Sequence, residues 1–281
     1  MHNSQFIETF DSKKLFLRRD LVDDPQAVVI IVHGLNGHQG RYDYFAGRLN
    51  GEGFSVYRFD NRGHGRSDGA QSYIEDFNTY LDDADTVYEL VKNENPELPI
   101  FMLGHSMGGF ITAGYGIKYP DKLDGQILSA AATNKLDSFS ELEELSLEDN
   151  PEMKLPNELG KFVSRSEYVV DDYKKDPYVS EFTTLKLVKV VFIDEGIPWL
   201  VDNLDQYNYP VLILHGEGDK IVDPSCSEKF YDLIASEDKS LKTYPELYHE
   251  ILNSEEKETV INDILNWLEE RVDIRINLKP E

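Results

Sequence analysis

The chain has 281 residues, of which 40% are hydrophobic and 29% are charged, a composition typical of a globular protein large enough to bury a sizeable core. Its 28 basic and 53 acidic residues give a formal net charge of −25. This charge disfavours binding to nucleic acid or to an anionic membrane surface, and it is compatible with a neutral small-molecule substrate.

A single cysteine, Cys226, excludes an internal disulfide and fits a reducing compartment. The first residues lack the basic segment and apolar core of a secretory signal. No apolar run approaches the roughly 20 residues that a membrane helix needs. We therefore expect a cytoplasmic protein without stable membrane insertion, and the sequence leaves its oligomeric state open.

Eight short runs of strand-forming residues are spread along the chain. The first two are close together and alternate in polarity, which favours an antiparallel hairpin at a sheet edge. The third, fifth and seventh are almost entirely apolar, which is typical of central strands of a parallel sheet. The expected strands are 6–10, 15–19, 27–32, 54–60, 100–103, 125–130, 210–215 and 240–244.

Helical stretches alternate with these strands. Residues 74–92 and 255–271 carry apolar side chains at three-to-four spacing on one face. Shorter helices are expected at 42–50, 109–119 and 225–234. This alternation predicts an α/β fold with a mostly parallel central sheet of about eight strands and helices on both faces.

The alternation of strands and helices stops between residues 133 and 209, where no strand is evident. Residues 138–150 are acidic, residues 155–173 have a helical pattern, and residues 185–204 are apolar on more than one side. We expect a helical cap (133–209) inserted into an α/β core (1–132 and 210–281). A segment that is apolar on several sides must be buried against the core on one side and against a second partner on another. This second partner is a lipid-like substrate or other cap residues. The apolar cap residues expected to line a substrate pocket are Ile193, Ile197, Trp199 and Leu200.

A candidate nucleophile lies directly after the fifth expected strand. Residues 104–108 read Gly-His-Ser-Met-Gly, between an apolar run and a helix-like stretch. In this context G-x-S-x-G is the pattern of a nucleophile elbow, whose strained backbone exposes the serine hydroxyl. Ser106 is the candidate, and an ordinary strand-to-helix turn is the alternative.

A serine hydroxyl needs a base that a carboxylate orients. His249 lies in the loop after the last expected strand and is the histidine that follows an acid located beyond the cap, which is the chain order of this kind of fold. The other six histidines lack this placement: His2, His33, His38, His64, His105 and His215.

The acid is expected in the loop that follows residue 215. Asp219 follows a glycine on a short turn, from which a carboxylate can reach a neighbouring loop. Glu217 and Asp223 are the alternatives, although Asp223 precedes Pro224 and Ser225 and can instead start the next helix.

An oxyanion hole requires two N–H donors. This kind of fold supplies the backbone N–H of the residue after the nucleophile, here Met107, and one from the loop after the third strand, here Leu35. The glycine-rich loop 60–69 matches no phosphate-binding motif, so we expect a buried polar loop beneath the site. H-E-x-x-H and cysteine clusters are absent from the sequence, so we expect no metal and no cofactor.

Five motifs stand in a recognisable order: His-Gly at 33–34 with Gly-Arg-Tyr at 40–42, the loop 60–67, Gly-His-Ser-Met-Gly-Gly at 104–109, residues 216–219, and Tyr-His at 248–249. In these the chain resembles monoacylglycerol lipases and related lysophospholipases of the α/β-hydrolase superfamily. The match covers most of the chain and is weakest in the cap, which is unusually acidic between residues 141 and 152. The resemblance implies a carboxylester hydrolase that cleaves a small acyl ester through an acyl-enzyme. It assigns the triad to Ser106, Asp219 and His249, the oxyanion hole to Leu35 and Met107, and the shaping of an acyl pocket to the cap.

Two other enzyme classes remain open. Proline iminopeptidases share this fold and triad, and the acidic cap would suit a free amino terminus, whereas the apolar stretch near Trp199 favours acyl chains. A general short-chain carboxylesterase is the second. Dehalogenases and epoxide hydrolases carry an aspartate where Ser106 stands. Non-catalytic relatives often lack a triad member, and all three candidates are present here.

Overall fold

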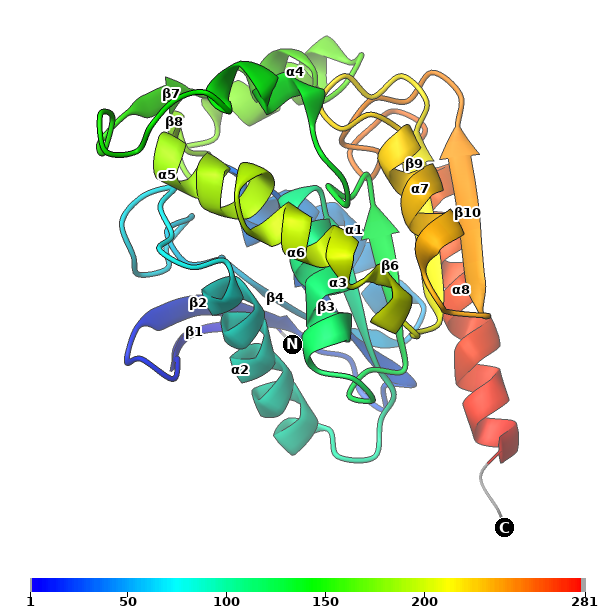
Figure 1. The fold of residues 1–281 in the computed structure, drawn as a ribbon. Coiled ribbons are helices and arrows are strands. Elements are labelled where there is room, and N and C mark those ends of the chain that lie inside the picture. The colour runs from blue at the N-terminus through cyan, green and yellow to red at the C-terminus, as the bar shows by residue number, and fades with distance from the viewer. Residues whose placement is uncertain (1, 279–281) are drawn as a thin grey trace.

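The computed structural model describes residues 2–278 and contains a central sheet of eight strands (Figure 1). From edge to edge they are β1 (His2–Glu8), β2 (Lys14–Asp20), β4 (Phe54–Phe59), β3 (Ala27–Val32), β5 (Ile100–His105), β6 (Gly125–Ser129), β9 (Val211–Gly216) and β10 (Lys239–Tyr244). β2 pairs antiparallel with β1 and β4, and the other pairs are parallel. The predicted hairpin and mostly parallel sheet are confirmed.

The first predicted strand, 6–10, is wrong at both ends. β1 begins at His2, which pairs with Asp20, and it ends before Thr9. Thr9 instead starts a turn whose residue Ser12 has a φ of 63°. The polar residues at the start of β1 give no apolar pattern, because backbone pairing with β2 rather than side-chain burial holds this edge strand.

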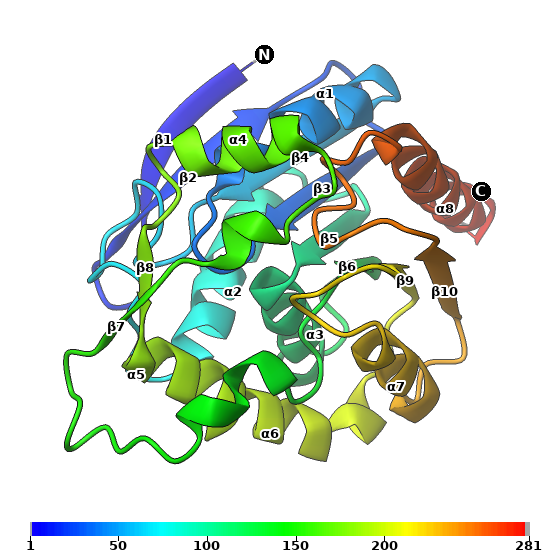
Figure 2. The same cartoon turned by 90° about the horizontal axis from the view of Figure 1, so that it is seen from above.

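Different helices cover the two faces of the sheet (Figures 1 and 2). On one face, Val28, Ile30 and Val32 of β3 share a core with α2 (Asn78–Glu94), α3 (Met107–Lys118) and α7 (Ser225–Leu233). On the other face, Val29 and Ile31 pack with α1 (Asp43–Gly51) and α8 (Lys257–Leu278). Each of these fully buried side chains contributes about 1.5–3 kcal/mol, and a strand covered on both faces has to be apolar throughout.

Residues 133–209, here called the cap segment, connect β6 to β9 across the end of the sheet where the parallel strands finish (Figures 1 and 2). A 3₁₀ turn in the core, η1 (Gln39–Tyr42), lies before α1. The elements of the cap segment are η2 (Asp137–Leu142), β7 (Lys154–Pro156), η3 (Leu159–Lys161), α4 (Glu167–Lys175), β8 (Phe182–Thr184), α5 (Leu185–Val188), η4 (Lys189–Ile193), α6 (Gly196–Asp202) and η5 (Leu204–Gln206). That the segment is a separate domain with these bounds stays a prediction.

Two expectations for the cap segment are wrong. A two-stranded antiparallel sheet of β7 and β8 stands where no strand was expected. The helix expected at 155–173 begins only at Glu167. Pro156 is tolerated at the edge of the short strand β7, and the 3₁₀ turn η3, which contains Gly160, interrupts the chain before the helix begins.

The apolar stretch 185–204 is helical, and protein side chains cover it. Leu187, Val191 and Leu200 are fully buried in the same core as α3, and Phe192 packs on Phe139 with ring centroids 5.2 Å apart. The core at α3 therefore covers one side of this stretch, and the cap residue Phe139 covers Phe192. None of the described helices is both long enough and apolar enough to cross a membrane.

Candidate active site

Ser106 occupies the sharp turn between β5 and α3. Its φ of 55° and ψ of −119° are a strained combination for a residue with a side chain, at a cost of about 1–3 kcal/mol. Hydrogen bonds maintain the turn, since the Ser106 N–H donates to the carbonyl of Ser129 at 3.0 Å and the Ser106 carbonyl accepts from Phe110 at 3.1 Å and Ala132 at 3.1 Å. The turn holds Ser106 at the end of the sheet beneath the cap segment.

Glycines allow the backbone to crowd around this turn. A Cβ on Gly104 would stand 2.1 Å from the Gly108 carbonyl oxygen, and a Cβ on Gly108 would stand 2.1 Å from the Val32 carbonyl oxygen. Both distances are far below van der Waals contact, so β3, β5 and α3 approach this closely only with glycine at these two positions.

Asp219 and His249 come from the loops that follow β9 and β10. The Nδ1 of His249 lies 2.6 Å from Oδ2 of Asp219. The other carboxylate oxygen accepts the backbone N–H groups of Ile221 at 2.8 Å and Val222 at 3.1 Å. The two loops are also joined directly, since the Gly218 N–H donates to the Leu247 carbonyl at 2.9 Å.

The alternative acids are engaged elsewhere. Glu217 accepts a hydrogen bond from the Thr243 hydroxyl at 2.8 Å, and Asp223 accepts the Ser225 N–H at the start of α7. The geometry therefore places Asp219, rather than Glu217 or Asp223, against His249.

Asp219 is buried and ionised. Burial favours its neutral form, but the charge interaction with His249 and the hydrogen bonds from His215 and His249 outweigh it. Together they hold the pKa of the Asp219 carboxyl well below its usual range.

Ser106 and His249 line one cavity of about 30 Å³. Within the described part of the chain, the Ser106 hydroxyl makes no hydrogen bond to His249, and such contacts commonly tighten only when substrate binds. His105 also lines the cavity, with its ring 4.6 Å from that of His249. Burial, with the proximity of His249, lowers the pKa of His105 to about 3, so its imidazole is neutral.

The predicted oxyanion donors belong to two segments that adjoin Ser106. Met107 is the first residue of α3, where a backbone N–H has no intrahelical acceptor. Leu35 belongs to a turn in which the Gly37 N–H donates to the Gly34 carbonyl at 3.2 Å. A Cβ on Gly34 would stand 3.0 Å from Cβ of Ser106, so this turn packs directly on the candidate nucleophile.

The loop 60–69 holds that turn in place through hydrogen bonds, as expected. Asp60 accepts the backbone N–H groups of Gln39 at 2.8 Å and Arg66 at 2.9 Å. The Asn61 N–H donates to Nε2 of His33 at 2.8 Å. Bonds within and from this loop therefore fix both η1 and the turn that carries Leu35.

A buried ion pair next to His249 was not predicted. Arg41 of η1 binds both carboxylate oxygens of Glu250, at 3.1 and 2.6 Å, and both side chains are at most 8% exposed. Burial raises the pKa of Glu250, but the charge of Arg41 and its hydrogen bonds outweigh this and lower it. Arg41 also lies 3.5 Å from Asp172 and 4.9 Å from the ring centre of Tyr173 in α4. The pair therefore links the histidine loop to the cap segment.

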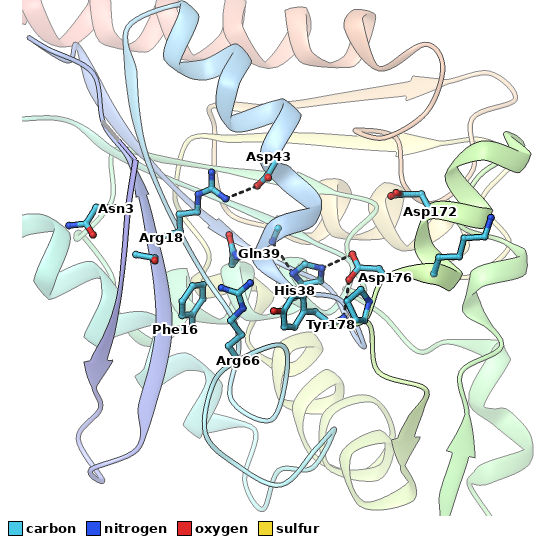
Figure 3. Close-up of a pocket in the computed structure, with 14 residues that line it drawn as sticks. Asn3, Phe16, Arg18, His38, Gln39, Asp43, Arg66, Asp172, Asp176 and Tyr178 are labelled. Carbon is cyan, nitrogen blue, oxygen red and sulfur yellow. Dashed lines mark hydrogen bonds and ion pairs between the residues drawn. The ribbon is translucent and has the colours of Figure 1, made fainter.

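A second hollow lies beside the site, with a volume of about 600 Å³ (Figure 3). It shares His38 with the Ser106 cavity, and His38 Nε2 lies 2.8 Å from Asp176 at the end of α4. In Figure 3 Arg66 stands between two aromatic rings, 4.7 Å from the ring centre of Phe16 and 4.4 Å from that of Tyr178. These contacts join the cap segment to the core on this side of Ser106.

The four apolar cap residues predicted to bind substrate do not line the cavity at Ser106. Ile193 and Ile197 line a separate cavity of about 250 Å³. Trp199 packs on Phe77 with ring centroids 5.4 Å apart, and Leu200 is fully buried. Their part in substrate binding stays a prediction.

The family described as "Serine aminopeptidase, S33" (Hydrolase_4) matches residues 23–257. The chain belongs to this family. It is 34% identical over 249 residues to a monoacylglycerol lipase of Mycolicibacterium smegmatis, a match that covers 87% of this chain and 89% of that relative. It is 30% identical over 259 residues to the monoglyceride lipase of Homo sapiens, covering 88% of this chain and 84% of the relative.

Solved structures agree in fold. The monoacylglycerol lipase of Paleococcus ferrophilus superposes with a TM-score of 0.79 at 29% identity, covering 92% of this chain and 99% of that one. A monoglyceride lipase variant of Saccharomyces cerevisiae superposes with a TM-score of 0.85 at 24% identity, covering 95% and 94%, which is a likeness of fold. The predicted α/β-hydrolase fold is confirmed, and so is the predicted class of enzyme, an ester-cleaving serine hydrolase.

Proposed function

We propose that the chain is a monoacylglycerol lipase or lysophospholipase that works through a Ser106–His249–Asp219 triad and an acyl-enzyme. The observation that carries the proposal is the placement of His249, whose Nδ1 lies 2.6 Å from buried Asp219 and whose ring lines the same cavity as Ser106. The two relatives described above are named for the hydrolysis of monoacylglycerol, and they support the substrate class.

Each residue has a defined task in this mechanism. His249 takes the proton of the Ser106 hydroxyl as its oxygen attacks the ester carbonyl. The N–H groups of Leu35 and Met107 bind the negative oxygen of the tetrahedral intermediate. His249 then gives the proton to the leaving alcohol, and water cleaves the acyl-enzyme by the same route. Asp219 orients the imidazole and stabilises its charged form throughout.

Substrate entry requires movement of the cap segment. A cavity of about 30 Å³ has room for about one water molecule. Its cap side consists of Leu159, Val163 and Tyr173. We infer that these residues move away before an ester reaches Ser106, as lids do in many enzymes.

The experiment that tests the proposal compares wild type with Ser106→Ala on a matched panel. The panel holds monoacylglycerols and p-nitrophenyl esters of graded chain length, lysophosphatidylcholine and a proline arylamide. We expect Ser106→Ala to lower kcat by roughly 10⁴ to 10⁶ and to abolish labelling by a fluorophosphonate. Retention of most ester hydrolysis by Ser106→Ala would falsify the proposed mechanism.

The panel also separates the alternatives. The family is described as a serine aminopeptidase, which makes an aminopeptidase the second candidate. Such an enzyme needs a carboxylate for the free amino terminus, and the carboxylate that lines the cavity, Glu250, is already bound by Arg41 and Asn253. Cleavage of the arylamide alone would move the chain to that class. A maximum at the shortest esters would identify a general carboxylesterase.

A cytoplasmic location remains part of the proposal, and the single cysteine supports it.

A further inference from the structure

His33, the last residue before the turn that carries Leu35, makes two hydrogen bonds that determine its protonation. Its Nδ1 lies 2.8 Å from the carbonyl oxygen of Gly34, which only accepts hydrogen bonds. Its Nε2 lies 2.8 Å from the backbone N–H of Asn61, which only donates. His33 is therefore a neutral imidazole with its proton on Nδ1.

The surroundings keep His33 in this state. The side chain is 1% exposed, and burial holds its pKa well below the usual range, with a smaller contribution from His64. Asn61 holds His33 at a second point, because its side-chain amide donates to the His33 carbonyl at 2.9 Å. The imidazole is thus a rigid neutral group between the loop 60–69 and the Gly34 carbonyl.

The bond to Gly34 fixes the direction of the next N–H group. The described peptide bonds are all trans, so the Gly34 carbonyl and the Leu35 N–H share one plane and point in opposite directions. His33 and Gly37 hold that carbonyl, at 2.8 and 3.2 Å. The Leu35 N–H therefore points to the opposite side, on a turn that packs against Ser106.

We propose that His33 is a positioning residue of the oxyanion hole, whose Nδ1–H holds the Gly34 carbonyl and thereby aims the Leu35 N–H at the developing oxyanion. The proposal rests on the function proposed above. An oxyanion donor acts when negative charge develops in the transition state, so its misplacement lowers kcat far more than it changes KM.

Two variants distinguish the hydrogen bond that Nδ1 of His33 makes from the one that Nε2 makes. In His33→Asn the amide nitrogen takes the place of Nδ1 and can still donate to the Gly34 carbonyl. In His33→Gln the amide oxygen takes the place of Nε2 and keeps the Asn61 bond, while the Gly34 carbonyl loses its donor. We expect kcat on a monoacylglycerol to fall about 100-fold in His33→Gln and less than about 10-fold in His33→Asn, with KM within about threefold in both.

His64→Gln is the matched control. His64 is equally buried, lies in the supporting loop and has its ring 5.5 Å from that of His33, but it takes part in neither hydrogen bond of His33. We expect this substitution to lower the thermal midpoint while kcat stays within about twofold of wild type. Binding of a trifluoromethyl ketone, which forms a tetrahedral adduct with serine, should weaken in His33→Gln in parallel with kcat/KM.

The outcomes are decisive. Equal kcat losses in His33→Gln, His33→Asn and His64→Gln would mean that the buried imidazole serves stability alone, and the proposal would fail. Unchanged ketone binding in a folded His33→Gln would also overturn it. If His33→Gln does not fold, His33→Asn decides. A kcat within about 10-fold of wild type supports the proposal because the donor to the Gly34 carbonyl is kept, and a kcat loss of about 100-fold despite that donor contradicts it. Retained activity in Ser106→Ala would instead contradict the proposed function itself.

Discussion

His215 donates a hydrogen bond from Nε2 to Oδ2 of Asp219, at 3.2 Å, the same oxygen that lies 2.6 Å from His249. The Nε2 of His215 also faces the Val222 carbonyl at 3.0 Å, and its Nδ1 lies 2.7 Å from the Ser227 hydroxyl. Because both partners of Nε2 are acceptors, this nitrogen carries a proton. His215 thus holds the same carboxylate oxygen of the proposed acid that faces His249.

This arrangement predicts that His215→Leu loses activity and stability while His215→Gln loses less. Leucine leaves a buried carboxylate without one donor, which costs about 1.5–3 kcal/mol in the free energy of unfolding. We expect kcat/KM of His215→Leu to fall about tenfold as Asp219 gains freedom, because orientation of the imidazole depends on that carboxylate. Glutamine can place an amide N–H near the position of Nε2. Urea unfolding and ester kinetics on both variants measure the difference, and equal behaviour of the two would contradict this role.

A second prediction concerns the turn that packs on the nucleophile. In Gly34→Ala the new Cβ would stand 3.0 Å from Cβ of Ser106 and 3.2 Å from the His105 carbonyl oxygen. Relief requires shifts of a few tenths of an ångström at the reacting residue, so we expect kcat to fall about tenfold or more. Single-turnover kinetics with a p-nitrophenyl ester report this step directly.

Gly47→Ala is the control for this substitution. Gly47 lies on the exposed side of α1, and a Cβ there would meet nothing within 4 Å. Alanine should raise the free energy of unfolding by about 0.5–1 kcal/mol and leave kcat unchanged. Full activity in Gly34→Ala would show that the turn tolerates displacement from Ser106.

The core of the fold was predictable because local pattern and burial agree there. β3 contains only apolar residues and lies between two layers of helices, so a short apolar run identifies both the strand and its central position. The same agreement located Ser106, because β5 and α3 flank it with unambiguous patterns. The strands of three residues in the cap segment have no period to detect, and pairing between residues as distant as Lys154 and Thr184 creates them.

The residues around the triad were harder to predict. The sequence excludes His33 and His215 as the base and includes His33 in a motif, but it gives neither a positioning role, since a sequence shows a histidine without its hydrogen-bond partners. Arg41 and Glu250 are 209 positions apart, so no local spacing joins them. The motif that includes Arg41 was one available signal, whereas Glu250 offered none beyond adjacency to His249.

A third prediction is a loss of stability below neutral pH. Burial lowers the pKa of His64 from 6.5 to about 4 and that of His105 to about 3, and it lowers that of His33 well below 6.5. Below pH 6.5 the unfolded chain takes up protons at these positions and the folded chain does not, so stability falls as the pH falls. The maximum slope is about 1.4 kcal/mol per pH unit for each histidine. Carboxylates with lowered pKa values, such as Asp219, add their own loss only below about pH 5.

Urea unfolding at several pH values between 7.5 and 5 checks this. We expect the free energy of unfolding to decrease steadily across that window in wild type. His64→Gln should show a slope shallower by up to one proton equivalent, because its amide does not titrate. A flat profile in wild type would rule out neutral buried imidazoles as the cause, and identical slopes in the two proteins would rule out a contribution from His64.

The last prediction concerns the ion pair beside His249. Arg41→Met leaves the Glu250 carboxylate, 8% exposed, without its cation, and removal of one partner of a buried pair costs about 3–5 kcal/mol. In Arg41→Met/Glu250→Leu both charges are gone, and apolar side chains of similar volume fill the space. We expect the double variant to recover most of the stability that the single variant loses.

A double-mutant cycle in urea measures this coupling. Glu250→Leu alone should cost less than Arg41→Met, because Arg41 retains Asp172 at 3.5 Å and the face of Tyr173. The expected interaction energy is about 1–3 kcal/mol, and additivity within about 0.5 kcal/mol would show that the two charges do not depend on each other.

Activity gives a second readout, since the pair joins the loop of His249 to α4. If the pair restrains the cap segment, the double variant should be stable and should have an altered KM for long acyl chains with less change for short ones.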